Sequence, residues 1–257
     1  MSEHVLVERE GGLLTLHLNR PDKMNALTRA MYSQLAEQLD AANADRSVRA
    51  VLITGGSECF TSGNDVADFL QAPPTSMDSP VFQFMRALFD FAKPVIAAVN
   101  GPAVGIGTTL LLHCDLVYVS RTAKLKMPFV NLGLCPEFGS SLILPRLLGQ
   151  AKAAELLLLG ESFTGEQAAQ WGIANAALEG GAEVLAKARE MAQRFLALAP
   201  SAVADSKRLM RAPGRTELRQ VIEEEGALFG QRLRSPEAIE SLSAFMQRRK
   251  PDFSKFA

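Results

Sequence analysis

The sequence predicts an α/β fold, and three observations lead to that prediction. Two short apolar runs, Ala50–Thr54 and Val95–Val99, are typical of buried strands. Each run is followed by a glycine-containing turn and then by the start of a helix, so one strand–turn–helix design occurs twice. The 257 residues, 47% of them hydrophobic, are enough to bury a sizeable core.

The N-terminal residues predict a β-hairpin followed by a helix. Residues 5–8 and 14–19 flank Gly11-Gly12, and leucine alternates with polar residues in the second segment. Because Thr15, His17 and Asn19 are the alternating polar positions, His17 is expected on the outward face of the strand and not as a catalyst. Thr28 is the expected N-cap of the next helix, which has an apolar residue at every fourth position from 31 to 39.

The two glycine-containing loops form the candidate anion site. In the second loop, Gly101, Gly105 and Gly107 allow a tight turn before a helix expected over residues 108–114. In the first loop, residues 59–69, a helix is expected to start at Asp65. The first N–H groups of a helix favour negative charge, so two such loops facing one point would form an oxyanion hole. The alternative is that the glycines only make tight strand-to-helix connections.

Two segments follow the first loop. Residues 71–80 are rich in proline and serine and predict a mobile surface loop that gates or shapes a binding pocket. Residues 81–91 predict an apolar helix, whose aromatic side chains either fill the core or line a tunnel for an apolar ligand group.

Helices dominate the second half of the chain. Pro128 and Pro136 interrupt any helix between them, and a new helix start is expected at residues 139–141. Thr164 and Gln167 form the pattern of a capping box. The remaining predicted elements are a strand at 173–178 and four helices, at 184–198, 201–211, 217–233 and 236–247.

Composition excludes several classes of function. The 27 Lys and Arg residues against 28 Asp and Glu residues give a formal charge of -1, so neither nucleic acid nor a membrane is an expected partner. No apolar run is long enough to span a bilayer, and the acidic start MSEHVLVERE is unlike a signal or transit peptide, so we expect a cytoplasmic location. Three cysteines without CxxC spacing, Cys59, Cys114 and Cys135, support neither a disulfide framework nor a metal site.

Five segments together resemble the enoyl-CoA hydratase/isomerase (crotonase) superfamily. They are, in chain order, NRPDKMNALT, SGNDVADF, NGPAVGIG, LGLCPEFGSSLILPRLLG and GESFTGEQAAQWGIAN. The resemblance implies a crotonase-like spiral of repeated ββα units over residues 1–200, which carries an acyl-CoA site. It also implies a C-terminal helical region, residues 201–257, that builds homotrimers or dimers of trimers. The expected partner is an acyl-CoA thioester, whose coenzyme A is part of the substrate, and no separate cofactor is expected.

The sequence departs from the superfamily pattern at two positions. Members that hydrate enoyl-CoA carry glutamates where this chain has Thr109 and Phe129. Neither side chain can activate water, so the departure argues against hydration. Glu137 lies instead in a PExxSS-like run that resembles the Δ3,Δ2-enoyl-CoA isomerase branch, in which a single glutamate at this place moves the proton.

This resemblance implies a mechanism in fatty acid β-oxidation. The backbone N–H groups of Asn64 and Ile106 would hold the thioester oxygen while Glu137 moves a proton from C2 to C4. Phe129, Leu132, Leu134 and Phe138 would keep the pocket dry and raise the pKa of Glu137. Because Asn64 acts only through its backbone, its replacement by alanine should be mild. A glutamate in a Pro-Glu turn is otherwise most often solvated.

The resemblance also implies a set of substrate contacts. The segment 23–27 would lie along the nucleotide end of coenzyme A, although Lys23 is equally explained as a solvated turn lysine. Asp65 is explained as well by helix capping. The implied contacts are Lys23, Met24, Ala26, Leu27, Ser62, Gly63, Asn64, Asp65, Val66, Gly105, Ile106, Phe129, Leu132 and Pro136.

Three functions therefore stay open at this point. They are an enoyl-CoA isomerase, an enoyl-CoA hydratase or another crotonase-type enzyme, and a non-catalytic acyl-CoA-binding protein. Thr109 is expected to be a helix-wall residue and His113 a structural one. The dispersed histidines do not suggest a catalytic triad, and Leu110 stands where a dinucleotide fingerprint needs its third glycine.

Overall fold

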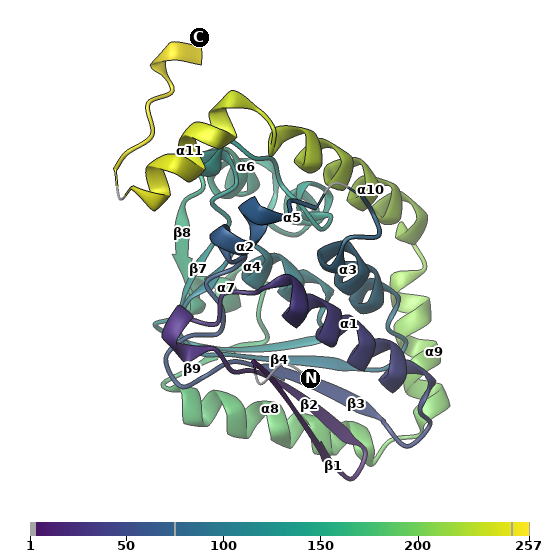
Figure 1. Ribbon diagram of the computed structural model, residues 1–257. Coiled ribbons are helices and arrows are strands. Elements are labelled where there is room, and N and C mark those ends of the chain that lie inside the picture. The colour runs from purple at the N-terminus through teal and green to yellow at the C-terminus, as the bar shows by residue number, and fades with distance from the viewer. Residues whose placement is uncertain (1–3, 75, 248, 257) are drawn as a thin grey trace.

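The computed structural model describes residues 4–74, 76–247 and 249–256. A six-stranded sheet, with strand order β1-β2-β3-β4-β6-β9, lies at the centre of the molecule (Figure 1). The first two strands form an antiparallel pair, and every later neighbour in this sheet pairs in parallel. The strands are β1 (Val5–Glu10), β2 (Leu13–Leu18), β3 (Ala50–Thr54), β4 (Val95–Val99), β6 (Leu116–Ser120) and β9 (Ala176–Leu178).

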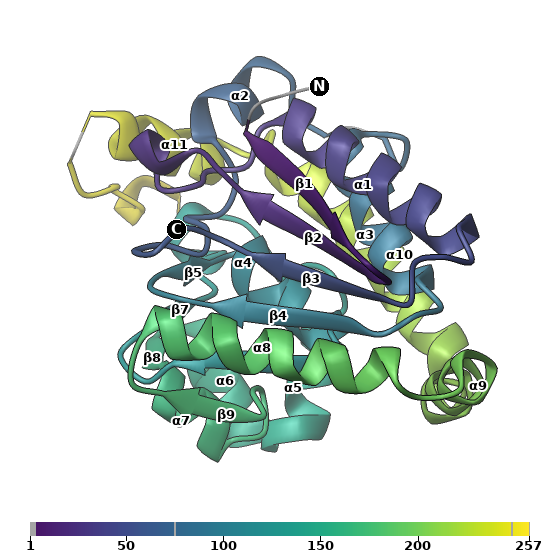
Figure 2. The same ribbon diagram turned by 90° about the horizontal axis from the view of Figure 1, so that it is seen from below.

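Helices cover both faces of this sheet, which explains why β3 and β4 are apolar throughout. α8 (Gly181–Leu196) packs on one face and contributes Val184, Ala188 and Ala192 to a core cluster with residues of β3, β4 and β6. α1 (Arg29–Ala44) and α3 (Pro80–Asp90) lie on the opposite face, as Figure 2 shows. Every residue of β3 and β4 is buried as a result. The α/β prediction is confirmed.

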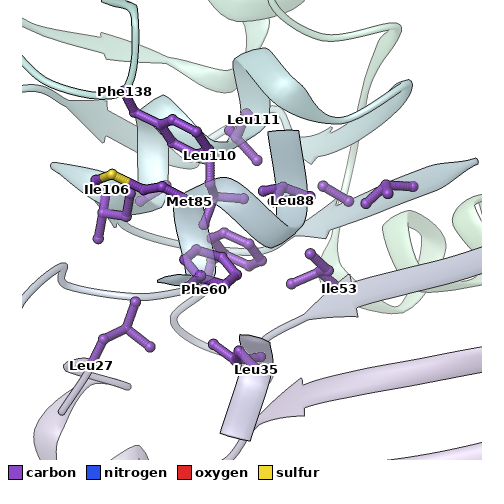
Figure 3. Close-up of a cluster of buried hydrophobic side chains, with 14 of the residues drawn as sticks. Leu27, Leu35, Ile53, Phe60, Met85, Leu88, Ile106, Leu110, Leu111 and Phe138 are labelled. Carbon is purple, nitrogen blue, oxygen red and sulfur yellow. The ribbon is translucent and has the colours of Figure 1, made fainter. Parts of the chain in front are cut away.

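The larger core cluster fills the space between the sheet and the helices on the second face. Figure 3 shows part of it, in which side chains from α1, β3 and α3 converge on Phe60. Met31 and Leu39 of α1 are fully buried, because an apolar residue at every fourth position gives one continuous face. Thr28 caps this helix, as predicted, by accepting a hydrogen bond from the backbone N–H of Met31 at 3.3 Å.

One strand residue and one helix boundary of the first half depend on packing. Thr15 of β2 is polar but only 4% exposed, because β2 is an inner strand and α8 packs on that face. The helix expected over 108–114 starts two residues earlier, as α4 (Ile106–Thr109), and continues as a 3₁₀ segment, η2 (Leu110–His113). Gly105, with φ of 57°, ends the preceding turn and so fixes the helix start at Ile106.

A second, three-stranded sheet lies beside the first. Its strands are β5 (Ala103–Val104), β7 (Lys124–Lys126) and β8 (Ser162–Thr164). The predicted capping box is present at α7 (Gly165–Gln170), where the side chains of Thr164 and Gln167 each accept a backbone N–H of the other residue. A 3₁₀ turn, η3 (Val130–Leu132), lies between the two prolines that interrupt this part of the chain.

The C-terminal part of the chain is helical, as predicted. After α5 (Ser140–Leu148) and α6 (Gln150–Leu158), the chain passes through α8 into three further helices. They are α9 (Pro200–Arg211), α10 (Arg215–Arg232) and α11 (Pro236–Met246). α11 returns to the body of the molecule beside η3 (Figure 1). No helix within the described residues combines the length and apolar character that crossing a bilayer needs.

The segment between α2 (Val66–Gln71) and α3 contains the predicted surface loop. Thr75 lies outside the described residues. The side chains of Ser76, Met77 and Asp78 are exposed, whereas Pro74 is buried.

The two glycine-containing loops touch each other through their backbones. Thr61 donates its N–H to the carbonyl of Pro102 at 3.1 Å and accepts the N–H of Val104 at 3.0 Å. A Cβ added at Gly63 would lie 2.7 Å from the carbonyl oxygen of Val104, and one added at Gly101 would lie 1.9 Å from that of Glu58. Glycine at these places therefore lets the loops pack as one unit.

This contact predicts unequal costs for two substitutions at left-handed glycines. Gly11, with φ of 55°, has open space where a Cβ would lie, whereas Gly101, with φ of 70°, does not. Gly11→Ala should lower the free energy of unfolding by about 1 kcal/mol through backbone strain alone. Gly101→Ala should cost about 3 kcal/mol or more, because the loops must separate. Urea denaturation of both variants measures the difference, and equal losses would contradict the proposed contact.

Candidate active site

Glu137 carries a buried carboxyl group in the turn that precedes α5. Its side chain is 4% exposed, and Thr109 of α4 donates its hydroxyl to Glu137 Oε1 at 2.6 Å. Burial raises the pKa of Glu137 to about 8, although the Thr109 hydrogen bond lowers it and the charge of Glu225 raises it further. At neutral pH the group can therefore both accept and donate a proton. Thr109 is thus a partner of this carboxyl group and more than a helix-wall residue.

A strained turn carries this carboxyl group. Phe138 has φ of 55° and Gly139 has φ of 74°, and the first of these is costly for a residue with a side chain. The ring of His113 stacks on that of Phe138 at 3.7 Å, and His113 Nε2 lies 2.7 Å from the carbonyl oxygen of Phe138. Burial lowers the pKa of His113 to about 3, so the neutral ring donates this hydrogen bond. His113 is therefore structural, as predicted, and its role is to hold the turn.

Two backbone N–H groups on the touching loops are available to an anion. Among the described residues, no acceptor pairs with the N–H of Asn64 or with that of Ile106. Ile106 is the first residue of α4, so its N–H is one of those that a helix leaves without an internal partner. The side chain of Asn64, in contrast to its N–H, has a hydrogen-bond partner, because Tyr32 donates its hydroxyl to Asn64 Oδ1.

Tyr32 connects the first loop with the surroundings of Glu137. Its side chain is 2% exposed, and burial raises its pKa well above the ordinary value. The charge of Glu137 raises that pKa further. The hydroxyl is thus kept as a hydrogen-bond donor to Asn64.

A cleft of about 960 Å³ adjoins Asn64, a size in the usual range for ligand sites. Six predicted contact residues line it: Lys23, Ala26, Ser62, Asn64, Asp65 and Val66. Arg20 and Gln71 line it as well, together with Phe245 and Met246 at the end of α11. Sequence reasoning did not predict this last pair, because α11 is far from the loops along the chain and only the fold brings it to the cleft.

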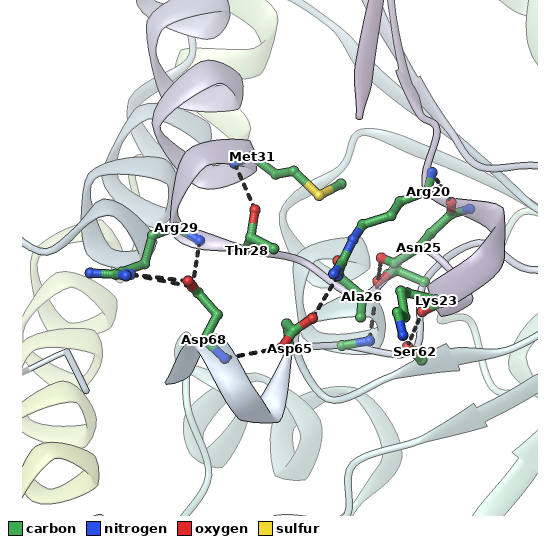
Figure 4. Close-up of polar contacts among 12 residues, drawn as sticks. Arg20, Lys23, Asn25, Ala26, Thr28, Arg29, Met31, Ser62, Asp65 and Asp68 are labelled. Carbon is green, nitrogen blue, oxygen red and sulfur yellow. Dashed lines mark hydrogen bonds and ion pairs between the residues drawn. The ribbon is translucent and has the colours of Figure 1, made fainter. Parts of the chain in front are cut away.

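An ion pair and a buried amide shape one wall of the cleft (Figure 4). Arg20 Nη1 donates to Asp65 Oδ2 at 2.6 Å and to the carbonyl of Ala26 at 3.0 Å. Asp65 also caps α2, as predicted, by accepting the N–H of Asp68 at 3.0 Å. Asn25 is 1% exposed and donates to the carbonyl of Cys59 at 2.9 Å. The first loop and the segment 20–27 are therefore held together.

The remaining predicted residues are spread over the site and the core. Gly63 and Gly105 belong to the touching loops, and an added Cβ at Gly105 would lie 3.9 Å from the ring of Phe129. Phe129 and Leu134 are buried, as is Leu27, whereas Met24 is half exposed. Leu132 belongs to η3, and Pro136 directly precedes Glu137. Their contact with a substrate stays a prediction.

Glu225 of α10 is a second buried carboxylate close to Glu137, and sequence reasoning missed it. Gly139 donates its N–H to Glu225 Oε2 at 2.5 Å, and Ser141 donates its N–H to Oε1 at 2.9 Å. Both oxygens are therefore occupied by backbone donors. Glu137 is therefore the carboxyl group of this pair that backbone donors leave available for chemistry.

Comparison of this chain with known proteins assigns it to one protein family. A model of the enoyl-CoA hydratase/isomerase family matches residues 8–255. The 1,2-epoxyphenylacetyl-CoA isomerase of Escherichia coli is 36% identical over 262 residues, which are 99% of this chain and 99% of the relative. Enoyl-CoA delta isomerase 2 of Rattus norvegicus is 35% identical over 257 residues, or 96% of this chain. The match covers 64% of the rat protein, so the chain spans less than two thirds of that relative.

A solved structure also resembles this one closely. The Pseudomonas aeruginosa protein OdaA is 73% identical, with a TM-score of 0.95, over 96% of this chain and 100% of that one.

The raised pKa of Glu137 predicts a stability that depends on pH. The folded state holds this proton up to about pH 8, whereas an unfolded glutamate releases it near pH 4.3. The stabilisation is therefore complete below pH 4.3 and is lost as the pH rises toward 8. Glu137→Gln stays neutral, so its stability relative to wild type should increase by a few kcal/mol between pH 5 and pH 8.5.

Urea denaturation at both pH values measures this change. Glu37→Gln, the same substitution at an exposed position of α1, serves as the control and should show no such trend. A stability difference between Glu137→Gln and wild type that is independent of pH would contradict the burial of an ionisable Glu137.

Proposed function

The chain belongs to the enoyl-CoA hydratase/isomerase family and has its crotonase-like fold, and we propose that it is a Δ3,Δ2-enoyl-CoA isomerase of fatty acid β-oxidation. The observation that carries the proposal is the buried carboxyl group of Glu137, which Thr109 holds at 2.6 Å and whose pKa burial raises to about 8. A double-bond shift by 1,3-proton transfer needs one group that first accepts and then returns a proton. A pKa near the working pH suits both halves of that task.

The substrate binds as a 3-enoyl-CoA thioester. Its nucleotide end lies along the cleft beside Lys23, where a positive side chain attracts phosphate. Its thioester oxygen accepts hydrogen bonds from the backbone N–H groups of Asn64 and Ile106. Such donors stabilise a negative oxygen most where water is excluded. The burial of Ile106, at 1% exposed, supports a dry site.

The reaction has two proton transfers. The Glu137 carboxylate removes a proton from C2, and the electron pair moves into a dienolate whose charge rests on the thioester oxygen. Protonated Glu137 then returns the proton to C4 while the double bond forms between C2 and C3, giving the 2-enoyl-CoA. Thr109, through its hydrogen bond at 2.6 Å, fixes the direction of the carboxyl group during both steps.

Hydration is disfavoured by the same arrangement. Adding water across a double bond requires groups that hold and deprotonate the water while a proton goes to the other carbon. Thr109 binds Glu137, and Phe129 has no polar atom in its side chain. Glu225 has both oxygens bound to backbone N–H groups, so it is not free to activate water.

The proposal is tested by comparing two reactions in wild type and Glu137→Gln. Wild type should convert 3-hexenoyl-CoA to 2-hexenoyl-CoA, with kcat/KM rising with pH up to about 8 and level above it. Glu137→Gln should lower kcat/KM by about 10² to 10⁴, the usual contribution of a positioned base. Glu37→Gln should behave as wild type.

Three outcomes would overturn the proposal in favour of another function. Loss of the enoyl absorbance of crotonyl-CoA through formation of 3-hydroxyacyl-CoA would indicate a hydratase. Turnover of 1,2-epoxyphenylacetyl-CoA without turnover of 3-enoyl-CoA would indicate the activity named for the Escherichia coli relative. Tight acyl-CoA binding without turnover of any thioester would indicate a binding protein.

The position of Lys23 predicts a selective effect on substrate affinity. Lys23→Ala should raise KM several-fold, with little change in kcat, because it removes a contact to a part of the substrate that does not react. The effect should shrink at high ionic strength. Steady-state kinetics at two salt concentrations measure it, with Lys124→Ala, an exposed lysine of β7, as the control. An unchanged KM would leave Lys23 as a solvated turn residue.

We further propose that the chain forms homotrimers or dimers of trimers through residues 201–257. Large apolar side chains exposed on α9 and α11 support this: Leu209 is 60% exposed, Met210 is 82% exposed and Ile239 is 53% exposed.

A further inference from the structure

Glu225 is a buried carboxylate that takes no part in the proposed proton transfer. It lies on α10 and is 7% exposed. Its two oxygens accept the backbone N–H groups of Gly139 and Ser141 at 2.5 and 2.9 Å. A carboxylate that holds two backbone donors at once links two elements in a fixed geometry, so Glu225 is a candidate for a positioning role.

α5 depends on this link for its N-terminal cap. Its N-cap residue is Gly139, which has no side chain and therefore cannot accept a hydrogen bond from the first turn of the helix. The first N–H groups of a helix need partners when they are buried. Glu225, 86 residues beyond Gly139 in the chain, supplies them from a different helix.

α10 also presses directly on the turn that carries Glu137. A Cβ added at Gly139 would lie 2.4 Å from Leu218 Cδ1 and 3.3 Å from Ile222 Cγ1, both on α10. Phe138, next to Glu137, has φ of 55°, a conformation that persists only where the surroundings enforce it. The hydrogen bonds of Glu225 hold the residues that immediately follow Phe138.

We propose that Glu225 is a positioning residue for Glu137: from α10 it clamps the strained turn 137–139, so that the C-terminal helices form part of the proton-transfer site. The catalytic part of this inference rests on the proposed isomerase function. The clamp itself does not, because it concerns the geometry of the turn.

The charge of Glu225 adds a second effect that can be measured. A negative charge nearby raises the pKa of Glu137, whereas the Thr109 hydrogen bond lowers it. The other titratable groups that face this pair are Tyr32 of α1, His113 of η2, Cys135 of the same loop and Glu224 of α10. His113 is neutral and Tyr32 keeps its proton, so Glu225 is the charge of this set that a substitution can remove selectively.

Two variants separate the clamp from the charge. In Glu225→Gln the amide accepts one N–H but turns a donor toward the other, and the charge is lost. We expect kcat for 3-hexenoyl-CoA to fall about 10- to 100-fold with KM within about two-fold, as for a misplaced catalytic group. The acid limb of the pH dependence of kcat should move to lower pH by about half a pH unit or more. Glu225→Asp keeps the charge but is too short, so kcat should fall while the limb stays in place.

Two measurements do not depend on isomerase activity. Infrared difference spectra of wild type against Glu137→Gln follow the protonation of Glu137 directly, and the same titration in Glu225→Gln should lie at lower pH. Amide hydrogen exchange of residues 138–142 should become faster in Glu225→Gln and in Glu225→Asp. Glu223→Gln, the same change at an exposed position of α10, is the control and should alter none of these readouts.

The outcomes distinguish the two proposals. If wild type lacks isomerase activity but both activity-independent readouts change as expected, the clamp stands and the proposed function fails. If Glu225→Gln and Glu225→Asp match Glu223→Gln in kcat, carboxyl titration and amide exchange, the positioning role is wrong. If Glu225→Gln does not fold, unchanged kcat and amide exchange in Glu225→Asp would overturn it equally.

Discussion

The whole site depends on keeping an ionisable carboxyl group out of water at the end of a strained turn. Burial alone would cost a charged Glu137 several kcal/mol, and the turn that carries it adds the strain of a left-handed Phe138. Neither is tolerated without support from the surroundings. The support comes from three directions: Thr109 at the carboxyl group, His113 at the Phe138 carbonyl and Glu225 at the following N–H groups.

These three supporting residues come from two parts of the chain that are far apart in sequence. Thr109 and His113 follow β4 in one short helical stretch, α4 and η2, that begins where the second glycine loop ends. Glu225 comes from α10, far along the sequence. The turn 137–139 is therefore a meeting point of the sheet-based half and the helical half of the molecule. Displacing either half would disturb the same carboxyl group.

The sequence was informative where one segment determines its own structure. The apolar runs of β3 and β4, the caps at Thr28 and Thr164, and the glycine turns follow from local patterns, and all of them are present. The family segments pointed to Glu137 because its run is continuous in the chain. The structure shows that this side chain is buried, as its proposed role requires.

The parts that the sequence could not predict depend on distant packing. Thr15 is buried because α8 packs on β2, and the residue pattern of β2 alone does not predict this packing. Tyr32 and Glu225 have ordinary positions on helical faces, and only the fold brings them to Asn64 and to the turn. The helix expected over 108–114 starts two residues earlier than predicted. The positive φ of Gly105 sets the helix start, and the spacing of the glycines does not predict that φ.

The end of α11, which borders the cleft with Phe245 and Met246, has a consequence for the order of events during synthesis. The loop that forms the opposite border, around Asn64, leaves the ribosome about 180 residues earlier. A growing chain can therefore complete its sheet and its glycine loops while this side of the cleft is still open to solvent. The side of the cleft that Phe245 and Met246 border therefore forms only after α11 has been synthesised and has packed against the rest of the chain.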